Sequence, residues 1–143
     1  MSVGVLLITH HAIGEQLLRT ATETLGGRPT QAACVAVRPD DDPARLLREA
    51  AGRIRELDQG QGVLILTDAY GSTPGNIALQ LARSDAIGVI AGLNLPMLLR
   101  VFNYAELPLA ALTGKAVQGG RNGVMMVAAR HATGEDGRCP NEH

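Results

Sequence analysis

Short apolar runs alternate with segments of helical periodicity along this chain. The apolar runs have the length of β-strands and lie at residues 3–9, 31–37, 62–67, 87–92 and 124–128. The helical patterns lie at residues 13–25, 43–57, 74–82, 95–104 and about 108–117. Near-continuous apolar strands joined by helices indicate a parallel sheet that is covered on both faces. We therefore predict a doubly wound, flavodoxin-like α/β fold of order 2-1-3-4, with residues 124–128 as a C-terminal edge strand.

Polar and glycine-rich segments separate the predicted strands and helices. Gly26-Gly27 end the first helix, as expected of helix C-caps. The acidic run at residues 40–42 precedes Pro43, so it predicts an N-cap followed by a proline in the first helical turn. A metal site is the alternative for this run, although no His or Cys accompanies it. The glycine-rich segment at residues 119–123 predicts a turn.

Length and composition place the chain among globular proteins. Its 143 residues, 45% of them hydrophobic, suit one domain at residues 1–130, and the polar tail at 131–143 is predicted to be disordered. The net charge of -1 gives no reason to expect a nucleic acid or an anionic membrane surface as a partner. Aromatic residues make up only 2%, which removes the usual stacking surface for single-stranded nucleic acid.

The two cysteines suggest neither a disulfide framework nor a metal pair. Cys34 stands in an apolar run, where it is expected to pack as a small hydrophobe, and Cys139 stands in the polar tail. The first residues lack a basic region, and their apolar run is too short for a signal peptide or a membrane span. We expect a cytoplasmic protein that has no cofactor, no metal and no membrane insertion.

His10 is the first candidate for chemistry, because it stands where the first strand ends and a helix begins. Ligands of open α/β sheets bind beyond the carboxyl ends of the strands. Asp68 ends the third predicted strand, and the order 2-1-3-4 makes that strand a neighbour of the first. The predicted topology therefore brings His10 and Asp68 side by side.

This pair suits a phosphoryl carrier. A neutral imidazole attacks phosphorus through one ring nitrogen while a carboxylate holds the proton on the other and orients the ring. The segment Gly71-Ser72-Thr73, before a helix begun by Pro74, offers backbone N–H groups, hydroxyls and a helix N-terminus to phosphoryl oxygens. No Lys or Arg stands beside these residues in the sequence, so the group would be held weakly enough to be passed on.

Each of these residues also has a simpler interpretation. A histidine after a strand is commonly a turn residue, and Asp68 could cap a turn or helix. Ser72 and Thr73 would form an ordinary N-cap in any case. His11 is a secondary candidate, because its side chain should point away from that of His10. The convergence of His10, Asp68 and the Ser72-Thr73 segment on one edge of the sheet supports the functional interpretation.

At these residues the chain resembles the mannose-family EIIA domain of the bacterial phosphoenolpyruvate-dependent sugar phosphotransferase system. The similar stretches are Thr9-His10 with residues 14–18, residues 68–74 with Asn76, residues 91–97, and residues 120–124. The resemblance implies that His10 accepts a phosphoryl group from phospho-HPr and passes it to a histidine of an EIIB partner. It implies that Asp68 orients His10 and that Ser72 and Thr73 contact the phosphoryl group.

The resemblance also implies a homodimer in which residues 124–128 reach the neighbouring subunit. The chain departs from the family at two positions, since His11 stands where Gly is frequent and Tyr70 where Trp is common. The sequence shows no EIIB domain of the kind that some family members carry as a fusion, and the acceptor is expected to be an EIIB protein or domain. Three alternatives remain: a regulatory sensor in a shortened phosphotransfer chain, the phosphoryl-donor subunit of a dihydroxyacetone kinase, and a passive anion-binding module.

Overall fold

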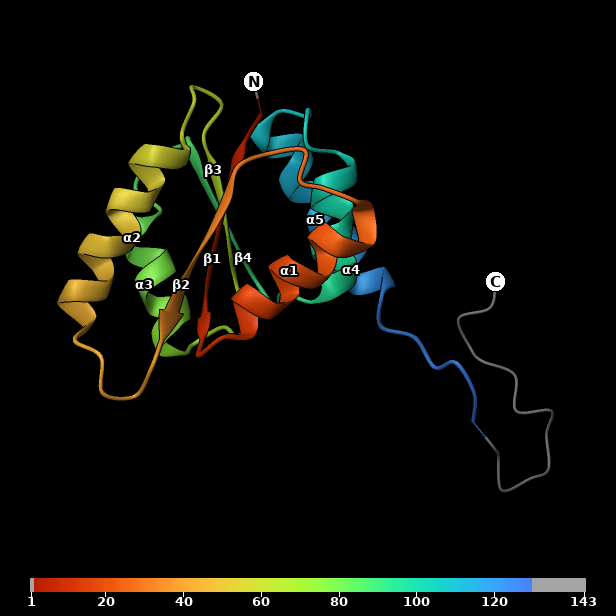
Figure 1. Cartoon of the computed structure of the whole chain (residues 1–143), viewed down its shortest axis with the longest axis horizontal. Coiled ribbons are helices and arrows are strands. Elements are labelled where there is room, and N and C mark those ends of the chain that lie inside the picture. The colour runs from red at the N-terminus through yellow and green to blue at the C-terminus, as the bar shows by residue number, and fades with distance from the viewer. Residues whose placement is uncertain (1, 130–143) are drawn as a thin grey trace.

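A parallel sheet lies between two groups of helices in the computed structural model, which describes residues 2–129 (Figure 1). The strands are β1 (Gly4–His10), β2 (Ala32–Val37), β3 (Val63–Thr67) and β4 (Ile87–Ala91). The helices are α1 (Ile13–Leu25), α2 (Pro43–Leu57), α3 (Thr73–Leu81), α4 (Leu95–Asn103) and α5 (Leu109–Asn122). All three strand pairs are parallel, and their order β2-β1-β3-β4 confirms the predicted topology.

Two apolar cores cover the two faces of the sheet, and β1 contributes to both. Val5 and Leu7 belong to the core beneath α1, α4 and α5, whereas Leu6 and Ile8 belong to the core beneath α2 and α3. These four side chains are fully buried, and each such burial is worth about 1.5–3 kcal/mol of transfer free energy. Because β1 is central and buried on both faces, it is a rigid base for the residues at its carboxyl end.

Helix α5 continues to Asn122 and is capped by Gly123, so it includes most of the glycine-rich segment at residues 119–123, where the sequence predicted a turn. Close packing explains the difference, since a Cβ at Gly119 would lie 2.6 Å from Arg100 Cβ. A Cβ at Gly120 would lie 2.7 Å from Met97 Cε. The glycines therefore allow α5 to approach α4, and the packing that they permit offsets their low helix propensity.

Residues 124–128 form no strand in the single chain, so the predicted C-terminal edge strand is not formed by one subunit alone. This segment leaves the body of the molecule after α5 (Figure 1). The four apolar side chains at residues 124–127 are between 43% and 79% exposed. A strand requires a hydrogen-bonding neighbour, and the described part of this chain supplies none here. The predicted tail at residues 131–143, which includes Cys139, lies outside the described residues.

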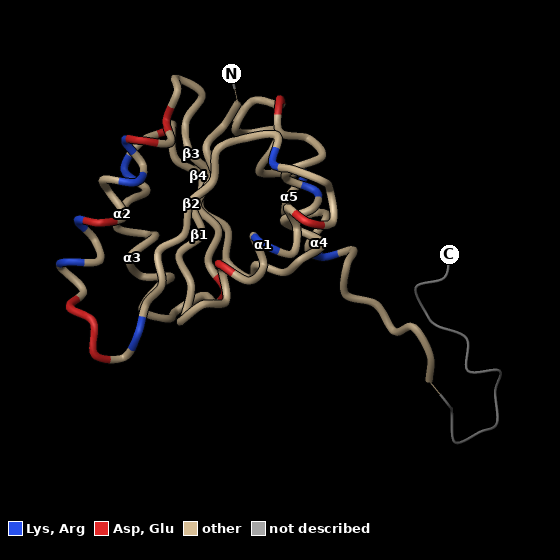
Figure 2. The backbone as a smooth tube through the Cα atoms, viewed as in Figure 1, with Lys and Arg blue, Asp and Glu red and all other residues tan. Residues whose placement is uncertain are grey.

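The acidic run before α2 caps that helix, as predicted. Asp42 accepts a hydrogen bond from the Ala44 N–H at 3.2 Å, and Asp41 accepts one from the Arg38 N–H at 2.8 Å. Acidic and basic residues are interspersed along α2 (Figure 2). These exposed ion pairs, such as the one between Arg45 and Glu49, contribute little stability.

Cys34 packs as a small apolar side chain on β2, as predicted from its apolar surroundings. Its burial, together with the nearby Glu15 carboxylate, raises the pKa of the thiol to about 11, although Arg28 opposes this shift. The thiol is therefore protonated at neutral pH. None of the helices in residues 2–129 is both long enough and apolar enough to span a membrane.

Candidate functional site

His10 and Asp68 meet at the carboxyl end of the sheet, as the strand order predicted. The Nδ1 atom of His10 lies 2.7 Å from Asp68 Oδ2, and the same oxygen accepts the backbone N–H of His10 at 3.2 Å. The His10 side chain is 43% exposed, whereas the Asp68 side chain is only 13% exposed. The Asp68 carboxylate is therefore held within the protein, whereas the His10 ring that it contacts remains open to solvent.

The geometry assigns different tasks to the two ring nitrogens. A carboxylate oxygen at 2.7 Å from Nδ1 holds the proton on that nitrogen. The Nε2 atom then carries the lone pair of the neutral ring. The other carboxylate oxygen of Asp68 is buried and has no hydrogen-bond partner among the described residues, so Oδ2 alone makes the contact with His10. The pair has the form of a nucleophile oriented by an acid residue.

The segment that follows Asp68 leads directly into α3. Gly71 turns the chain with a φ of 79°, and Ser72 is the N-cap of the helix. The Ser72 hydroxyl donates to the Ala69 carbonyl at 2.6 Å and accepts from the Gly75 N–H at 3.2 Å. Its oxygen is thus engaged in the cap, which confirms the simpler interpretation of Ser72. Thr73 is exposed at the first position of α3.

The start of α1 lies at the same edge of the sheet. Its N-cap residue, Ala12, offers no side-chain acceptor, but the Thr9 hydroxyl accepts the Gly14 N–H at 2.8 Å. This contact fixes α1 to the end of β1, close to His10. The positive ends of the α1 and α3 dipoles therefore face the edge that carries His10, and they favour an anion there.

His11 adopts a left-handed backbone conformation with a φ of 47°. Residues with a Cβ avoid this region at a cost of about 1 kcal/mol, which explains physically why a glycine would suit the position. The backbone N–H of His11 donates to the Val37 carbonyl at 2.9 Å, so the turn is held by β2. The departure from the family pattern at His11 is thus accommodated without loss of the turn. Its side chain is exposed.

Arg38 lies at the same edge of the sheet as His10. No Lys or Arg is close to His10 in the sequence, so this cation comes from the end of a different strand. Val37 is the register partner of His10 in the pair of β1 and β2, and Arg38 follows Val37. Sequence reasoning missed this residue because it belongs to another segment of the chain. Only the strand pairing could reveal its proximity to the site.

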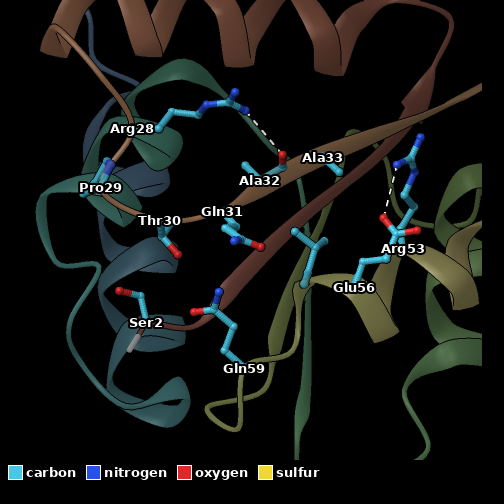
Figure 3. Close-up of a pocket in the computed structure, with 11 residues that line it drawn as sticks. Ser2, Arg28, Pro29, Thr30, Gln31, Ala32, Ala33, Arg53, Glu56 and Gln59 are labelled. Carbon is cyan, nitrogen blue, oxygen red and sulfur yellow. Dashed lines mark hydrogen bonds and ion pairs between the residues drawn. The ribbon is translucent and has the colours of Figure 1, made fainter.

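A separate hollow of about 580 Å³ lies at the opposite end of the sheet, around the start of β2 (Figure 3). Its cations already have partners, because Arg28 donates to the Ala32 carbonyl at 3.3 Å and Arg53 contacts Glu56 at 3.4 Å. In a parallel sheet this is the end away from the site of chemistry. The candidate site is therefore the shallow edge around His10.

Comparisons with known proteins agree with this geometry. A family described as "PTS system fructose IIA component" (EIIA-man) matches residues 4–116. The chain is 31% identical over 133 residues to the "PTS system mannose-specific EIIAB component" of Escherichia coli K12. That alignment covers 91% of this chain and 41% of the relative, so the chain spans about two fifths of the length of the curated relatives that it matches.

Solved structures show the same fold. The chain superposes on the "Mannose/sorbose specific IIA subunit of phosphotransferase system from Enterococcus faecalis" with a TM-score of 0.79 and 23% identity, over 92% of this chain and 98% of that one. It also superposes on the "PTS IIA protein associated with the fucose utilization operon from Streptococcus pneumoniae" with a TM-score of 0.74 and 22% identity, over 89% and 96% of the two chains.

Proposed function

This chain belongs to the EIIA-man family of the phosphoenolpyruvate-dependent sugar phosphotransferase system, and we propose that His10 is its phosphoryl carrier. Phosphoryl transfer within that system is the general activity of the family. In the proposed cycle, phospho-HPr donates a phosphoryl group to His10, and His10 passes it to a histidine of an EIIB protein or domain. The regulatory and dihydroxyacetone kinase alternatives are not favoured, because the family and its curated relatives are components of sugar phosphotransferase systems.

The contact between His10 Nδ1 and Asp68 Oδ2 at 2.7 Å is the observation that carries this proposal. It leaves the lone pair of Nε2 free to attack phosphorus. As the new bond between Nε2 and phosphorus forms, the bond between phosphorus and the donor's imidazole nitrogen breaks, and the electron pair returns to the donor ring. Asp68 stabilises the positive charge that develops on the His10 ring. Transfer to EIIB is the same step in the opposite direction.

Backbone groups and Thr73 would hold the phosphoryl oxygens. The segment Gly71-Ser72-Thr73 begins α3, so its N–H groups lie at the positive end of a helix dipole. The Ser72 hydroxyl is engaged in capping, and we therefore assign to Ser72 a contact through its backbone and to Thr73 a contact through its exposed hydroxyl.

Phosphorylation of the wild-type protein tests the proposed function directly. The protein is incubated with phosphoenolpyruvate, enzyme I and the HPr of the same organism, and its intact mass is measured at neutral pH. We expect one added phosphate that is lost in acid and retained in alkali, as a phosphorus–nitrogen bond requires. A folded protein that gains no phosphate from its own HPr would contradict the proposal and favour an anion-binding module.

We also propose that the protein is a homodimer in which residues 124–128 lie against the neighbouring subunit. Four consecutive apolar side chains at residues 124–127 are exposed in the single chain, and such patches commonly mark protein interfaces. The edge strand β4 has one side without a neighbour in the sheet of residues 2–129. A segment from a second copy could therefore satisfy both features at once.

Replacing Val124 and Val127 together with Asp is expected to convert the dimer into monomers, because the interface would then bury two unpaired carboxylates. Size-exclusion chromatography with light scattering measures the change. Leu79→Asp is the matched control, since Leu79 is 50% exposed on α3, and it should leave the dimer intact. A wild-type protein that is monomeric at all concentrations would refute the proposed dimer.

A further inference from the structure

Two buried side-chain oxygens beside the candidate site have no hydrogen-bond partner among the described residues. They are Thr67 Oγ1 and Asp68 Oδ1, and no other buried side-chain nitrogen or oxygen within residues 2–129 lacks a partner. The two residues are consecutive, at the carboxyl end of β3, and Thr67 is only 1% exposed. Burying a polar atom without a partner costs free energy, so two such atoms at one place require an explanation.

The Thr67 hydroxyl and the Asp68 carboxylate lie on the same side of the sheet. Ile65 belongs to the core beneath α2 and α3, so the alternation of side chains along β3 places Thr67 on that side. Ile8, the register partner of Thr67, belongs to the same core, and alternation along β1 therefore places His10 there as well. Because Asp68 Oδ2 contacts the His10 ring at 2.7 Å, the carboxylate of Asp68 also reaches this side.

The surroundings of Thr67 offer its hydroxyl no other polar side chain. All the buried members of the core on this side are Leu, Ile, Val or Ala. A valine would fill the position of Thr67 with the same shape and without a buried hydroxyl, as Val63 does at the other end of β3. The position is also rigid, since the Thr67 carbonyl accepts the N–H groups of Gly92 and Leu93, each at 3.0 Å. The Asp68 carboxylate is therefore the natural partner of this hydroxyl.

We infer that Thr67 is a positioning residue that holds the Asp68 carboxylate through one bound water molecule. The hydroxyl donates to the water oxygen, and the water donates to Asp68 Oδ1, which as part of an ionised carboxylate can only accept. Oδ2 already accepts from the backbone N–H of His10 and lies against its ring, so the carboxylate is then held at both oxygens. This inference rests on the proposed function, and it adds the residue that supports Asp68 from below.

The first test compares two substitutions of Thr67 by the kinetics of transfer to the full-length protein over a range of phospho-HPr concentrations. Thr67→Val keeps the shape and removes the hydroxyl, so kcat should fall about threefold to tenfold with KM nearly unchanged. Thr67→Ser keeps the hydroxyl and should retain the wild-type kcat. The matched control is Thr30→Val, because the buried Thr30 hydroxyl donates to the Val3 carbonyl at 2.6 Å, away from the site, and kcat should not change.

A double-mutant cycle shows whether Thr67 acts through Asp68. In the Asp68→Asn background the carboxylate is already gone, so Thr67→Val should lower kcat by less than about twofold. An equal loss in both backgrounds would mean that Thr67 acts independently of Asp68, and it would overturn the inference. An unchanged kcat in Thr67→Val, or the same loss in Thr67→Ser, would also overturn it, because the hydroxyl would then have no role.

Two further readouts do not depend on phosphoryl transfer. A crystal structure of the wild-type protein should show one ordered water within about 3.2 Å of both Thr67 Oγ1 and Asp68 Oδ1. The nitrogen-15 resonance of His10 Nδ1 should shift in Thr67→Val and stay in place in Thr30→Val. Absence of this water, or an unshifted resonance, refutes the role of Thr67. A wild-type protein that accepts no phosphate refutes the proposed function instead, so the two failures are distinguishable.

Discussion

Replacing His10 with Ala is expected to abolish phosphate acceptance from phospho-HPr. The imidazole is the proposed nucleophile, and neither the carboxylate of Asp68 nor the hydroxyl of Thr73 can replace it in an exchange between histidines. The loss should therefore be complete within the sensitivity of intact-mass measurement at neutral pH. The variant should remain folded, because the ring is 43% exposed and the backbone N–H of residue 10 can still donate to Asp68 Oδ2.

His11→Ala is the matched control for this experiment. His11 is the adjacent imidazole and is exposed, but it has no hydrogen bond to a carboxylate among the described residues. This control should still accept one phosphate, and thermal unfolding of both variants should verify that they are folded. Undiminished labelling of His10→Ala would move the acceptor to another residue, and loss of labelling in His11→Ala alone would identify that residue as His11.

The second large effect is expected for Asp68→Asn, which should slow phosphoryl transfer by a factor on the order of 10²–10⁴. An amide at residue 68 can still accept the backbone N–H of His10, so the local fold is preserved. It carries no charge, however, so it favours the Nδ1–H tautomer less strongly and stabilises less well the positive charge that develops on the ring. Removing the carboxylate that orients a catalytic histidine has an effect of this size in serine proteases. Single-turnover rates with phospho-HPr would measure it.

A structural readout distinguishes this positioning role from simple loss of stability. Nitrogen-15 spectra of the His10 ring should indicate the Nδ1–H tautomer in the wild-type protein and a mixture of tautomers in Asp68→Asn. Asp58→Asn is the matched control, because Asp58 also accepts backbone N–H groups but lies after α2, at the opposite end of the sheet. A normal transfer rate in Asp68→Asn would show that the 2.7 Å contact is only structural.

All four strands of the sheet and all five helices could be predicted from periodicity, although α5 extends to Asn122, beyond its predicted end near residue 117. The predicted strand at residues 62–67 differs from β3 (Val63–Thr67) by one residue, and the predicted helices at 13–25 and 43–57 coincide with α1 and α2. These segments are long, strongly patterned and bounded by capping residues such as Asp42. The local sequence is therefore sufficient to predict the bounds of a helix or strand where the hydrophobic pattern and the capping residues agree.

The predictions failed where glycine or an isolated apolar run left the outcome to packing. Residues 119–123 have the composition of a turn, but the small size of Gly119 and Gly120 allows α5 to continue against α4. Residues 124–128 have the composition of a strand, but no neighbouring strand exists for them in one described chain. Composition cannot reveal whether a partner surface is within reach.

The candidate site also has features that the sequence predicted and features that only the structure revealed. The sequence by itself determined the α/β class and identified His10, Asp68 and the N-cap at Ser72 as candidates. It could do so because the residues next to a strand end or a helix start are sufficient to predict that boundary. Only the tertiary structure decided that Asp68 Oδ2 reaches His10 Nδ1 and that Arg38 follows the register partner of His10. Such distances depend on strand pairing and on the packing of helices over the sheet, and these join residues that are remote in the sequence.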